Sequence, residues 1–403
     1  MLFDLDDPGL LFRDDVLADP RPLYAELREH APIWQLAGQD TFLVSDPALV
    51  RDATGRPDDF SSNMVSMIHR GRDGAATPFA MLAYGDPGNV LAIADPPDHT
   101  RHRKLLQPHL SPAAVAGFEP SVRALTDERL DEMLVNGRGD AVVQLADPIP
   151  AALICELLGL PTTDTDQLVP HVLAVGALLD GMADEDGMAQ GGVAAIELAG
   201  YAQATLDAQR ARPADERSPL VHAAIEAIDA DEVTNDEVVG MLVQLFTAGT
   251  ETTQSLTATT IDLLARDAEL QSTLRADPGR IPDALEDVLR ADGPFQFHYR
   301  WAPHDTQLGD TAIPAGSRVL LLWSAANQGS AAPVGDRVPP HFAFGRGIHF
   351  CIGSALARLE ARVMIEQLLA RTSSFRLDPE RPPRRRPSIM LRRHASLPLL
   401  LEA

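Results

Sequence analysis

The chain has 403 residues, of which 45% are hydrophobic, and its formal net charge is −24 at pH 7. This composition supports a folded chain with a large core and excludes a disordered or fibrous protein. A charge this negative argues against nucleic-acid binding, which needs basic patches, and against docking on anionic membranes. We therefore predict neither nucleic acid nor membrane as a partner.

The cysteine content and the N-terminal segment bear on location. Two cysteines, Cys155 and Cys351, cannot form a disulfide framework. The N-terminal segment is acidic, with Asp4 and Asp6, where a secretion signal needs basic residues followed by an apolar run. No apolar run reaches the roughly 20 residues of a membrane span. These features predict a cytoplasmic location.

The first hundred residues read as short elements. A helix is expected over Leu23–Glu29, followed by a hairpin whose arms are Pro32–Leu36 and Thr41–Val44 around Gly38. The Asp46-Pro47 pair opens another short helix. The stretch 61–94 is rich in Gly and Pro and reads as irregular.

Helical periodicity extends from Pro97 to Leu289, and the longest helix begins at Thr234 and runs past Leu256 to Leu264. Thr234 and Glu237 have the spacing of a capping box. Short strands such as Val319–Trp323 follow, then a loop over Gln328–Pro340, a helix over Ile352–Ala370 and edge strands in Pro387–Leu401. The chain is therefore expected to be mainly α with small sheets, in a single domain of residues 1–403.

The most informative stretch is Phe-Gly-Arg-Gly-Ile-His-Phe-Cys-Ile-Gly, residues 344–353. Its glycines permit tight backbone geometry, and Gly353 lets a flat ligand come close. Cys351 directly precedes a helix, whose free N–H groups and partial positive charge favour a thiolate over a thiol. The stretch therefore predicts a ligating or reactive cysteine.

Three other interpretations of a cysteine remain open on the residues alone. A lone cysteine is usually a small buried hydrophobe, which suits Cys155 in its apolar surroundings. A zinc site of His341, His349 and Cys351 lacks a further ligand at the usual spacing. A nucleophilic cysteine needs a base and oxyanion donors, and only His349 is near in sequence.

The 344–353 pattern resembles the cytochrome P-450 superfamily, and the resemblance extends over nearly the whole chain, most closely to soluble bacterial members. It implies the cytochrome P-450 fold, a helix-rich prism with small β-sheets, that holds haem b. By the resemblance, Cys351 is the thiolate ligand of the haem iron, and Phe344 and Gly353 also contact the haem. Such a thiolate pushes electron density onto iron and favours O–O cleavage.

A second motif, Ala-Gly-Thr-Glu-Thr at residues 248–252, lies in the long helix. Helical spacing puts Leu245, Ala248, Thr252 and Leu256 on one face, where Ala248 and Gly249 leave room for the haem. Glu251 and Thr252 resemble the family's acid–alcohol pair, which implies a catalytic role in delivering protons to bound oxygen. The alternative is a surface acid and a threonine that bonds back to a carbonyl one turn earlier.

The two haem carboxylates need cations or hydrogen-bond donors once they are buried. His99 and Arg103 are four residues apart on one predicted helix, so they share a face, while His102 points elsewhere. The resemblance implies that His99, Arg103, Arg300 and His349 bind these carboxylates.

The sequence departs from the family at two places. The usual Glu-x-x-Arg is here Asp287-x-x-Arg290, and Glu286, one turn before Arg290, could also pair with it. The segment Gln328–Pro340 is shorter than in relatives, and Arg337 is the candidate for the second arginine of this ion pair. Both departures concern the scaffold and not the iron ligand.

The resemblance also implies a substrate pocket and an electron donor. The pocket candidates are apolar, as in most ligand sites, and are Met64, Met67, Ile68, Leu178, Leu179, Leu245, Ala248, Phe295, Phe297 and Met390. The substrate expected is a hydrophobic or amphipathic small molecule. Because no flavin or iron–sulfur segment is fused to the chain, electrons are expected from a separate ferredoxin-type protein, docking near Arg346, Arg358 and Arg362.

The function predicted is therefore a monooxygenase that uses O₂ and two electrons, in hydroxylation or epoxidation. Three alternatives remain: a haem-thiolate enzyme of other oxidative chemistry, such as coupling, desaturation, dehydration or peroxide-driven oxidation; a haem-binding sensor or carrier without turnover; and a metal-free helical scaffold. The Glu251–Thr252 pair favours catalysis, since a carrier needs no proton relay.

Overall fold

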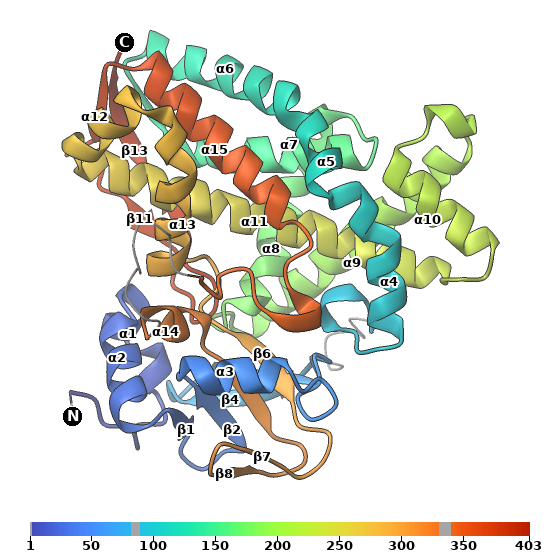
Figure 1. The fold of residues 1–403 in the computed structure, drawn as a ribbon, viewed down its shortest axis with the longest axis vertical. Coiled ribbons are helices and arrows are strands. Elements are labelled where there is room, and N and C mark those ends of the chain that lie inside the picture. Colours follow the sequence, from blue (N-terminus) through green and yellow to red (C-terminus); the bar gives the residue numbers. More distant parts are fainter. Residues whose placement is uncertain (1, 82–88, 330–339) are drawn as a thin grey trace.

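The computed structural model describes residues 2–81, 89–329 and 340–403. Helices make up most of the fold, and α11 (Asn235–Arg266) runs through their middle (Figure 1). Two buried hydrophobic clusters each contain residues of α11, the first from its C-terminal part and the second from its N-terminal part, so this helix lies at the centre of the core. Around it lie α6 (Glu119–Val135), α7 (Pro148–Leu157), α8 (Thr165–Leu179), α9 (Glu185–Arg210), α10 (Pro219–Asp229), α12 (Ala268–Ala276), α13 (Ile281–Asp292) and α15 (Ser354–Arg371).

The start of α11 follows from the capping box that the sequence predicts. The Thr234 side chain accepts a hydrogen bond from the backbone N–H of Glu237, and the Glu237 carboxylate accepts one from the Thr234 N–H. Asp236 and Glu237 also complement the positive end of the helix dipole. This anchors the register that brings Ala248 and Thr252 to the site.

A four-stranded sheet lies at the bottom of the view in Figure 1, at the end of the molecule opposite to α6 and α12. Its strand order is β1 (Ile33–Gln35), β2 (Thr41–Val44), β9 (Arg318–Leu321), β6 (His298–Trp301). β2 and β9 are parallel, with Thr41 beside Arg318, and β6 is antiparallel to β9. After their first residues, Thr41 and Arg318, both central strands are continuous apolar runs, as expected for strands covered on both faces. The predicted hairpin is thereby confirmed, and the strand predicted over Val319–Trp323 forms but ends at Leu321, because Trp323 begins a helix.

Short helices pack around this sheet and lead into the site. The predicted helix near Leu23 and the one after Asp46 both form, and the Asp46 carboxylate caps the latter by accepting from Ala48 and Leu49 N–H groups. The short helices are α1 (Asp14–Ala18), α2 (Arg21–His30), α3 (Pro47–Thr54), α4 (Asp98–Leu106), α5 (Pro112–Val115) and α14 (Trp323–Gln328).

The stretch 61–94 is more regular than the sequence suggests. β3 (Ser66–Arg70) and β4 (Ala76–Ala80) form an antiparallel hairpin, with Met67 opposite Phe79. Met67 and Ile68 are both fully buried, so tertiary packing imposes the strand on a segment whose Gly and Pro content favours a loop. Residues 82–88, in the same stretch, lie outside the described residues.

The C-terminal tail contributes a central strand and not only an edge. β13 (Pro398–Glu402) lies between β10 (Ser374–Leu377) and β5 (Arg138–Asp140). The remaining strands form two-stranded ribbons, β7 (Thr306–Leu308) with β8 (Thr311–Ile313) and β11 (Arg384–Arg385) with β12 (His394–Ser396).

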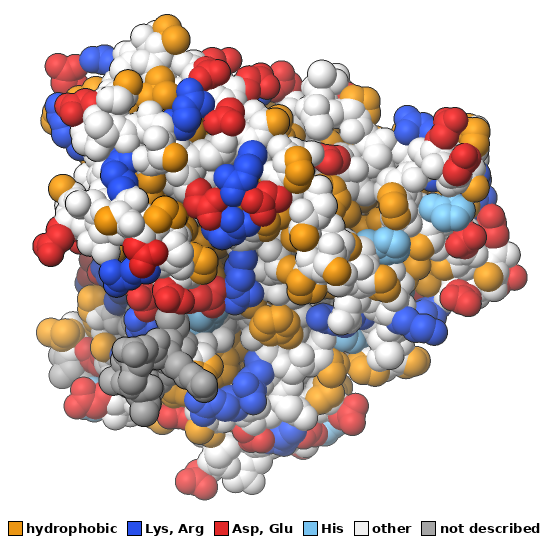
Figure 2. All heavy atoms as spheres, turned by 45° about the horizontal axis from the view of Figure 1, so that its top comes forward, with side chains coloured by type: hydrophobic (Ala, Val, Ile, Leu, Met, Phe, Trp, Pro, Cys, Tyr) orange, Lys and Arg blue, Asp and Glu red, His pale blue; other side chains and the backbone are white. Residues whose placement is uncertain are grey.

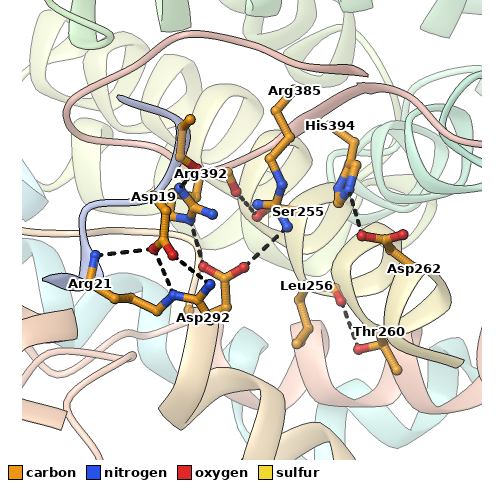
Figure 3. A network of polar contacts seen from close by, with 12 residues as sticks. Asp19, Arg21, Ser255, Leu256, Thr260, Asp262, Asp292, Arg385, Arg392 and His394 are labelled. Carbon is orange, nitrogen blue, oxygen red and sulfur yellow. Dashed lines mark hydrogen bonds and ion pairs between the residues drawn. The ribbon is translucent and has the colours of Figure 1, made fainter. Parts of the chain in front are cut away.

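The segment around β12 is fixed to α11 and α13 by a polar network (Figure 3). Figure 3 shows the Asp292 carboxylate between Arg385 and Arg392. The ion pairs measure 3.1 Å to Arg385 and 2.6 Å to Arg392. Ser255 of α11 donates to the Arg392 carbonyl, and His394 pairs with Asp262. This network holds the tail, including Arg393, against the middle of α11.

No helix in the described part of the chain is long and apolar enough to span a membrane.

Candidate functional site

A cavity lies between α11, α15, α4 and the edge of the four-stranded sheet. Its empty volume is about 1430 Å³, which includes space that is open to solvent. Its wall includes Cys351, Phe344, Gly353, His99, Arg103, Arg300, His349, Leu245, Ala248, Gly249, Thr252 and Phe295. The structure thus brings together the residues of four sequence motifs that are far apart along the chain.

The loop before Cys351 takes a tight path that depends on glycine. Gly345 and Gly347 have positive φ values of 67° and 73°, which other residues rarely adopt. A Cβ at Gly347 would also lie 2.6 Å from the Thr54 carbonyl oxygen. The Cys351 N–H donates to the Phe344 carbonyl over 2.8 Å, which closes the loop and presents the sulfur to the cavity.

The electrostatic environment of Cys351 has two opposing parts. Burial raises the pKa of the Cys351 thiol, while the backbone N–H groups of Gly353 and Ser354 and the guanidinium groups of Arg103 and Arg358 act in the opposite direction. The predicted helix begins at Ser354, so its free N–H groups do face the sulfur. A metal cation at the sulfur would overcome the effect of burial, because a coordinated thiol is deprotonated.

An ion-pair cluster packs against the ring of Phe344. The Arg358 guanidinium lies 4.2 Å from the centre of the Phe344 ring. Glu286 binds Arg358 through both carboxylate oxygens and binds His341 over 2.9 Å. Burial opposes ionisation of Glu286, but Arg358 and His341 lower its pKa to about 2. Glu286 therefore fixes the cation that lies on Phe344.

The two neighbouring acids in the middle of α13 have different partners. Arg290 pairs with Asp287 over 3.0 Å, and Glu286 instead pairs with Arg358 and His341. The candidate Arg337 and most of the segment Gln328–Pro340 lie outside the described residues.

One face of α11 forms the opposite wall. Leu245, Ala248, Thr252 and Leu256 all line the cavity, as the helical spacing predicts. A Cβ at Gly249 would lie 2.5 Å from the Ile154 side chain, so glycine at this position lets α7 pack closely against α11. Thr252 donates its hydroxyl hydrogen to the Ala248 carbonyl over 2.7 Å, the back-bond that is one alternative for this residue, and its side chain still faces the cavity.

Glu251 faces the other way. It is 4% exposed and forms an ion pair with Arg393, which also pairs with Asp180 over 3.0 Å. A Cβ at Gly176 of α8 would overlap the Glu251 carboxylate, so α8 covers it closely. The interpretation as a surface acid is therefore wrong, and the partner Arg393 could not be found from local sequence.

Nitrogen donors gather at the sheet end of the cavity. His99 and Arg103 both line it, and the His99 and His349 rings are 4.2 Å apart. His102 points away, as predicted, and binds Glu237 over 3.0 Å. Nε2 of His349 is buried without a partner among the described residues. Burial, and then the charges of Arg300 and His99, lower the pKa of His349 to about 2.

Arg300 completes this set of donors. Burial lowers the pKa of Arg300 to about 10, and Asp95 is the acid that partly offsets this effect. Asp95 itself accepts hydrogen bonds from Ser61 and the Ser62 N–H. Cationic and N–H groups thus outnumber acceptors, and an orphaned imidazole nitrogen lies among them. The residues fit a ligand that carries carboxylates, as haem does.

The predicted substrate residues divide into two groups. Leu245, Ala248 and Phe295 line the cavity, but the other candidates are not among its described lining. Met67, Ile68, Phe297 and Met390 are instead buried in a hydrophobic cluster, and Met64 and Leu179 pack against it. Leu178 lies against Gly191 of α9. Apolar lining residues that the sequence did not single out include Leu91, Ala92, Ile154, Leu289 and Pro294.

Two of the three arginines proposed for partner docking have internal partners. Arg358 binds Glu286, and Arg362 binds Glu119 and Glu366. Figure 2 shows acidic and basic side chains mixed on the face that carries α6 and α15. Arg346 is exposed and has no ion pair in the described part of the chain.

A zinc site at His341, His349 and Cys351 does not form. Among the described residues, no group of three His, Cys, Asp or Glu side chains could hold a metal ion. His341 is instead bound to Glu286, and His349 lies against His99.

Comparison with known proteins identifies the family. The chain is 36% identical over 379 residues to cytochrome P-450 144 of Mycobacterium tuberculosis, covering 91% of this chain and 86% of that protein. It is 32% identical over 393 residues to the cytochrome P-450 monooxygenase PikC of Streptomyces venezuelae, covering 90% and 86%. No protein-family model matches the sequence.

A solved structure agrees with these relatives. The cytochrome P-450 enzyme CxnD, which forms a C–S bond in chuangxinmycin biosynthesis, has a TM-score of 0.81 and 28% identity, covering 95% of this chain and 94% of that chain. Sequence and fold thus lead to one conclusion. The chain belongs to the cytochrome P-450 family and is a haem-thiolate monooxygenase that uses haem b.

Proposed function

We propose that Cys351 is the iron ligand of this enzyme and that residues 1–403 act as one domain in the cytoplasm. The observation that carries the assignment is the position of the Cys351 sulfur in the same cavity as the donors His99, Arg103, Arg300 and His349. When bound, the haem supplies the redox centre at which O₂ is reduced and one oxygen atom reaches the substrate.

The four donors would hold the haem carboxylates. Arg300 keeps guanidinium N–H groups free, because its Nη1 donates to the Tyr299 carbonyl and no acid pairs with it in the described chain. Arg103 donates Nε–H to Gln107 and has its other N–H groups available. Hydrogen bonds to an ionised carboxylate are each worth about 1.5–3 kcal/mol, so this set orients the cofactor.

Thr252 and Glu251 would supply protons to the oxygen side. Thr252 can hold a proton donor or a water at Oγ1, since its side chain faces the cavity. Glu251 is buried behind the same turn of α11 and is held by Arg393. We assign Thr252 the contact with the reacting oxygen, and Glu251 the supply of protons from the far side of the helix.

The cavity favours a hydrophobic or amphipathic small molecule. Its wall above the cysteine is mainly apolar, with Leu245, Phe295 and Leu91, and Gln244 adds one amide. Apolar contact would provide the binding energy while few polar groups set the orientation. Electrons come from a separate transfer protein, and we propose a ferredoxin that docks beside Arg346.

The test is the absorption spectrum of the reduced protein with carbon monoxide. A strongly red-shifted Soret band marks thiolate ligation, and we expect it for the wild type. Cys351→His should keep haem but lose the shift, whereas Cys155→Ser, at the buried cysteine, should retain it. Haem-containing wild-type protein without the shift would reject Cys351 as the ligand.

A further inference from the structure

His298 is a cavity residue that the sequence motifs did not indicate. It lies on β6 two residues before Arg300, so the two side chains share one face of the strand. Both line the cavity, and the His298 ring stands 4.4 Å from the Phe295 ring. The imidazole therefore packs against an aromatic ring, on the same face of the strand as the arginine of the donor set.

One hydrogen bond fixes the tautomer of this histidine. Nε1 of Trp323 donates to Nδ1 of His298 over 2.6 Å. An indole nitrogen can only donate, so Nδ1 carries no proton and Nε2 must carry it. Burial, and then the charge of Arg300, lower the pKa of His298 to about 3, so the ring is neutral at ordinary pH. His298 therefore presents one N–H donor, at Nε2.

Trp323 is itself immobilised. It is 1% exposed, begins α14, and its ring stacks with Phe342 at 6.3 Å between centroids. This packing restricts the indole and keeps its N–H directed at His298. Nε2 of His298 has no hydrogen-bond partner in the part of the chain that the structure describes.

The free donor belongs to the cationic end of the cavity. His298, Arg300, His99, Arg103 and His349 all line the same cavity, and the His99 and His349 rings are 4.2 Å apart. The acid near them, Asp95, is already engaged by Ser61 and Ser62. An additional neutral donor at this end is suited to a carboxylate that enters with the ligand.

We propose that His298 donates its Nε2–H to a haem carboxylate, as a fifth donor beside the four already assigned, and that Trp323 is its positioning residue. This inference rests on the proposed haem site. The same chemistry could serve a carboxylate on the substrate, and measurements on haem-loaded, substrate-free protein separate the two sources.

The test compares His298→Leu, which removes the donor, with His298→Gln, which restores an amide N–H. Haem loss to excess apomyoglobin should be about tenfold faster in His298→Leu, since a charge-assisted bond is worth at least one factor of ten. His298→Gln should recover part of the loss. His304→Gln, at an exposed histidine bonded to Asp59, is the control and should match the wild type.

A second readout concerns the haem itself. Without a donor, the carboxylate keeps more negative charge, so the midpoint potential of His298→Leu should fall. The carboxylate bending bands in resonance Raman spectra should shift in the same variant, and Trp323→Phe should share the shift because Nδ1 loses its donor.

Two results would overturn the inference. One is wild-type haem loss, potential and Raman bands in substrate-free His298→Leu. The other is an effect of His298→Leu that appears only on binding of a long-chain fatty acid, which would assign the donor to a substrate carboxylate. Absence of the thiolate band in wild-type protein is a different result, because it would refute the proposed haem site itself.

Discussion

Arg393 of the C-terminal tail pairs with Glu251 of α11 beneath the surface, where the two side chains are 1% and 4% exposed. The arginine binds Asp180 at the end of α8 as well, so one cation serves two buried carboxylates. Burial raises the pKa of Asp180, and Arg393 opposes that effect. The acid proposed to supply protons is therefore tied to the tail and to α8.

Thr252→Ala should separate oxygen use from product formation. Removing the hydroxyl deletes the group proposed to pass protons to bound oxygen, so product should fall by about 100-fold while reductant use continues and peroxide accumulates. Product and peroxide per reductant are the measurement. Thr247→Ala, which removes a similar back-bond to Val243, should remain coupled. Normal coupling in Thr252→Ala would exclude the relay.

Arg393→Met should destabilise the fold by about 3–5 kcal/mol, because it leaves Glu251 and Asp180 buried without their cation. Urea unfolding at pH 7 measures the loss. Adding Glu251→Gln and Asp180→Asn should restore most of the stability, since neutral side chains no longer need the guanidinium. Arg376→Met, at an exposed position on β10, should stay within about 0.5 kcal/mol of the wild type.

Glu286→Gln should change the acid limb of the stability curve. The pKa of Glu286 is lowered from 4.5 to about 2 in the folded protein, with burial opposing the effect of Arg358 and His341. A lowered pKa contributes stability that is present above pH 4.5 and is lost as pH falls toward 2. The variant should be less stable by roughly 3 kcal/mol at pH 7 and equal to the wild type near pH 2. A constant difference across this range would contradict the ion-pair explanation.

Glu360→Gln should stabilise the protein at neutral pH. Glu360 is 1% exposed, its Oε2 has no partner among the described residues, and burial raises its pKa well above 4.5. A raised pKa gives stability that is present below pH 4.5 and is lost as pH rises toward the folded value. Glutamine cannot ionise, so the variant keeps this stability, and its advantage over the wild type should grow by about 1.4 kcal/mol per pH unit between 4.5 and the folded pKa of Glu360. Denaturation at pH 4.5 and 7 tests this slope, and parallel curves would refute it.

Arg346→Gln should weaken reduction by the electron donor more than Arg362→Gln does. Arg346 is exposed without an ion pair among the described residues, whereas Arg362 is bound to Glu119 and Glu366. An unpaired cation attracts an acidic partner more strongly than a neutralised one. The ferredoxin concentration for half-maximal reduction should rise for Arg346→Gln and lose its salt dependence. The carbon monoxide spectrum of each variant checks that the haem site is intact.

Features that depend on local spacing could be predicted from the sequence. The capping box at Thr234 fixed the start of α11, and the four-residue separation of His99 and Arg103 placed both on the cavity. The glycines before Cys351 indicated a loop that only positive φ values allow. Each of these signals comes from residues within one or two turns of one another, where backbone geometry decides the outcome.

Features that depend on distant partners could not be predicted. Arg393 reaches Glu251 only because the tail crosses α11, and Trp323 reaches His298 through the pairing of β6 with β9. Pocket and core residues are also alike in type, so the sequence could not distinguish between them. Met67, Phe297 and Met390 are predicted in the pocket but are buried in a hydrophobic cluster and are not on the described cavity wall. Apolar character shows that a side chain is buried but does not show against what.

The parallel pairing of β2 with β9 has a consequence for how the chain reaches its final form. Thr41 must meet Arg318, so this contact closes most of the chain into a loop, and its entropic barrier is higher than that of the helical contacts around α11. During synthesis, β2 cannot pair until β9 has left the ribosome, whereas the intervening helices can assemble before that. The strand that carries His298 and Arg300 pairs with β9 too. We therefore expect the cavity wall that binds the haem carboxylates to form last. Haem should then bind late in folding and should not nucleate it.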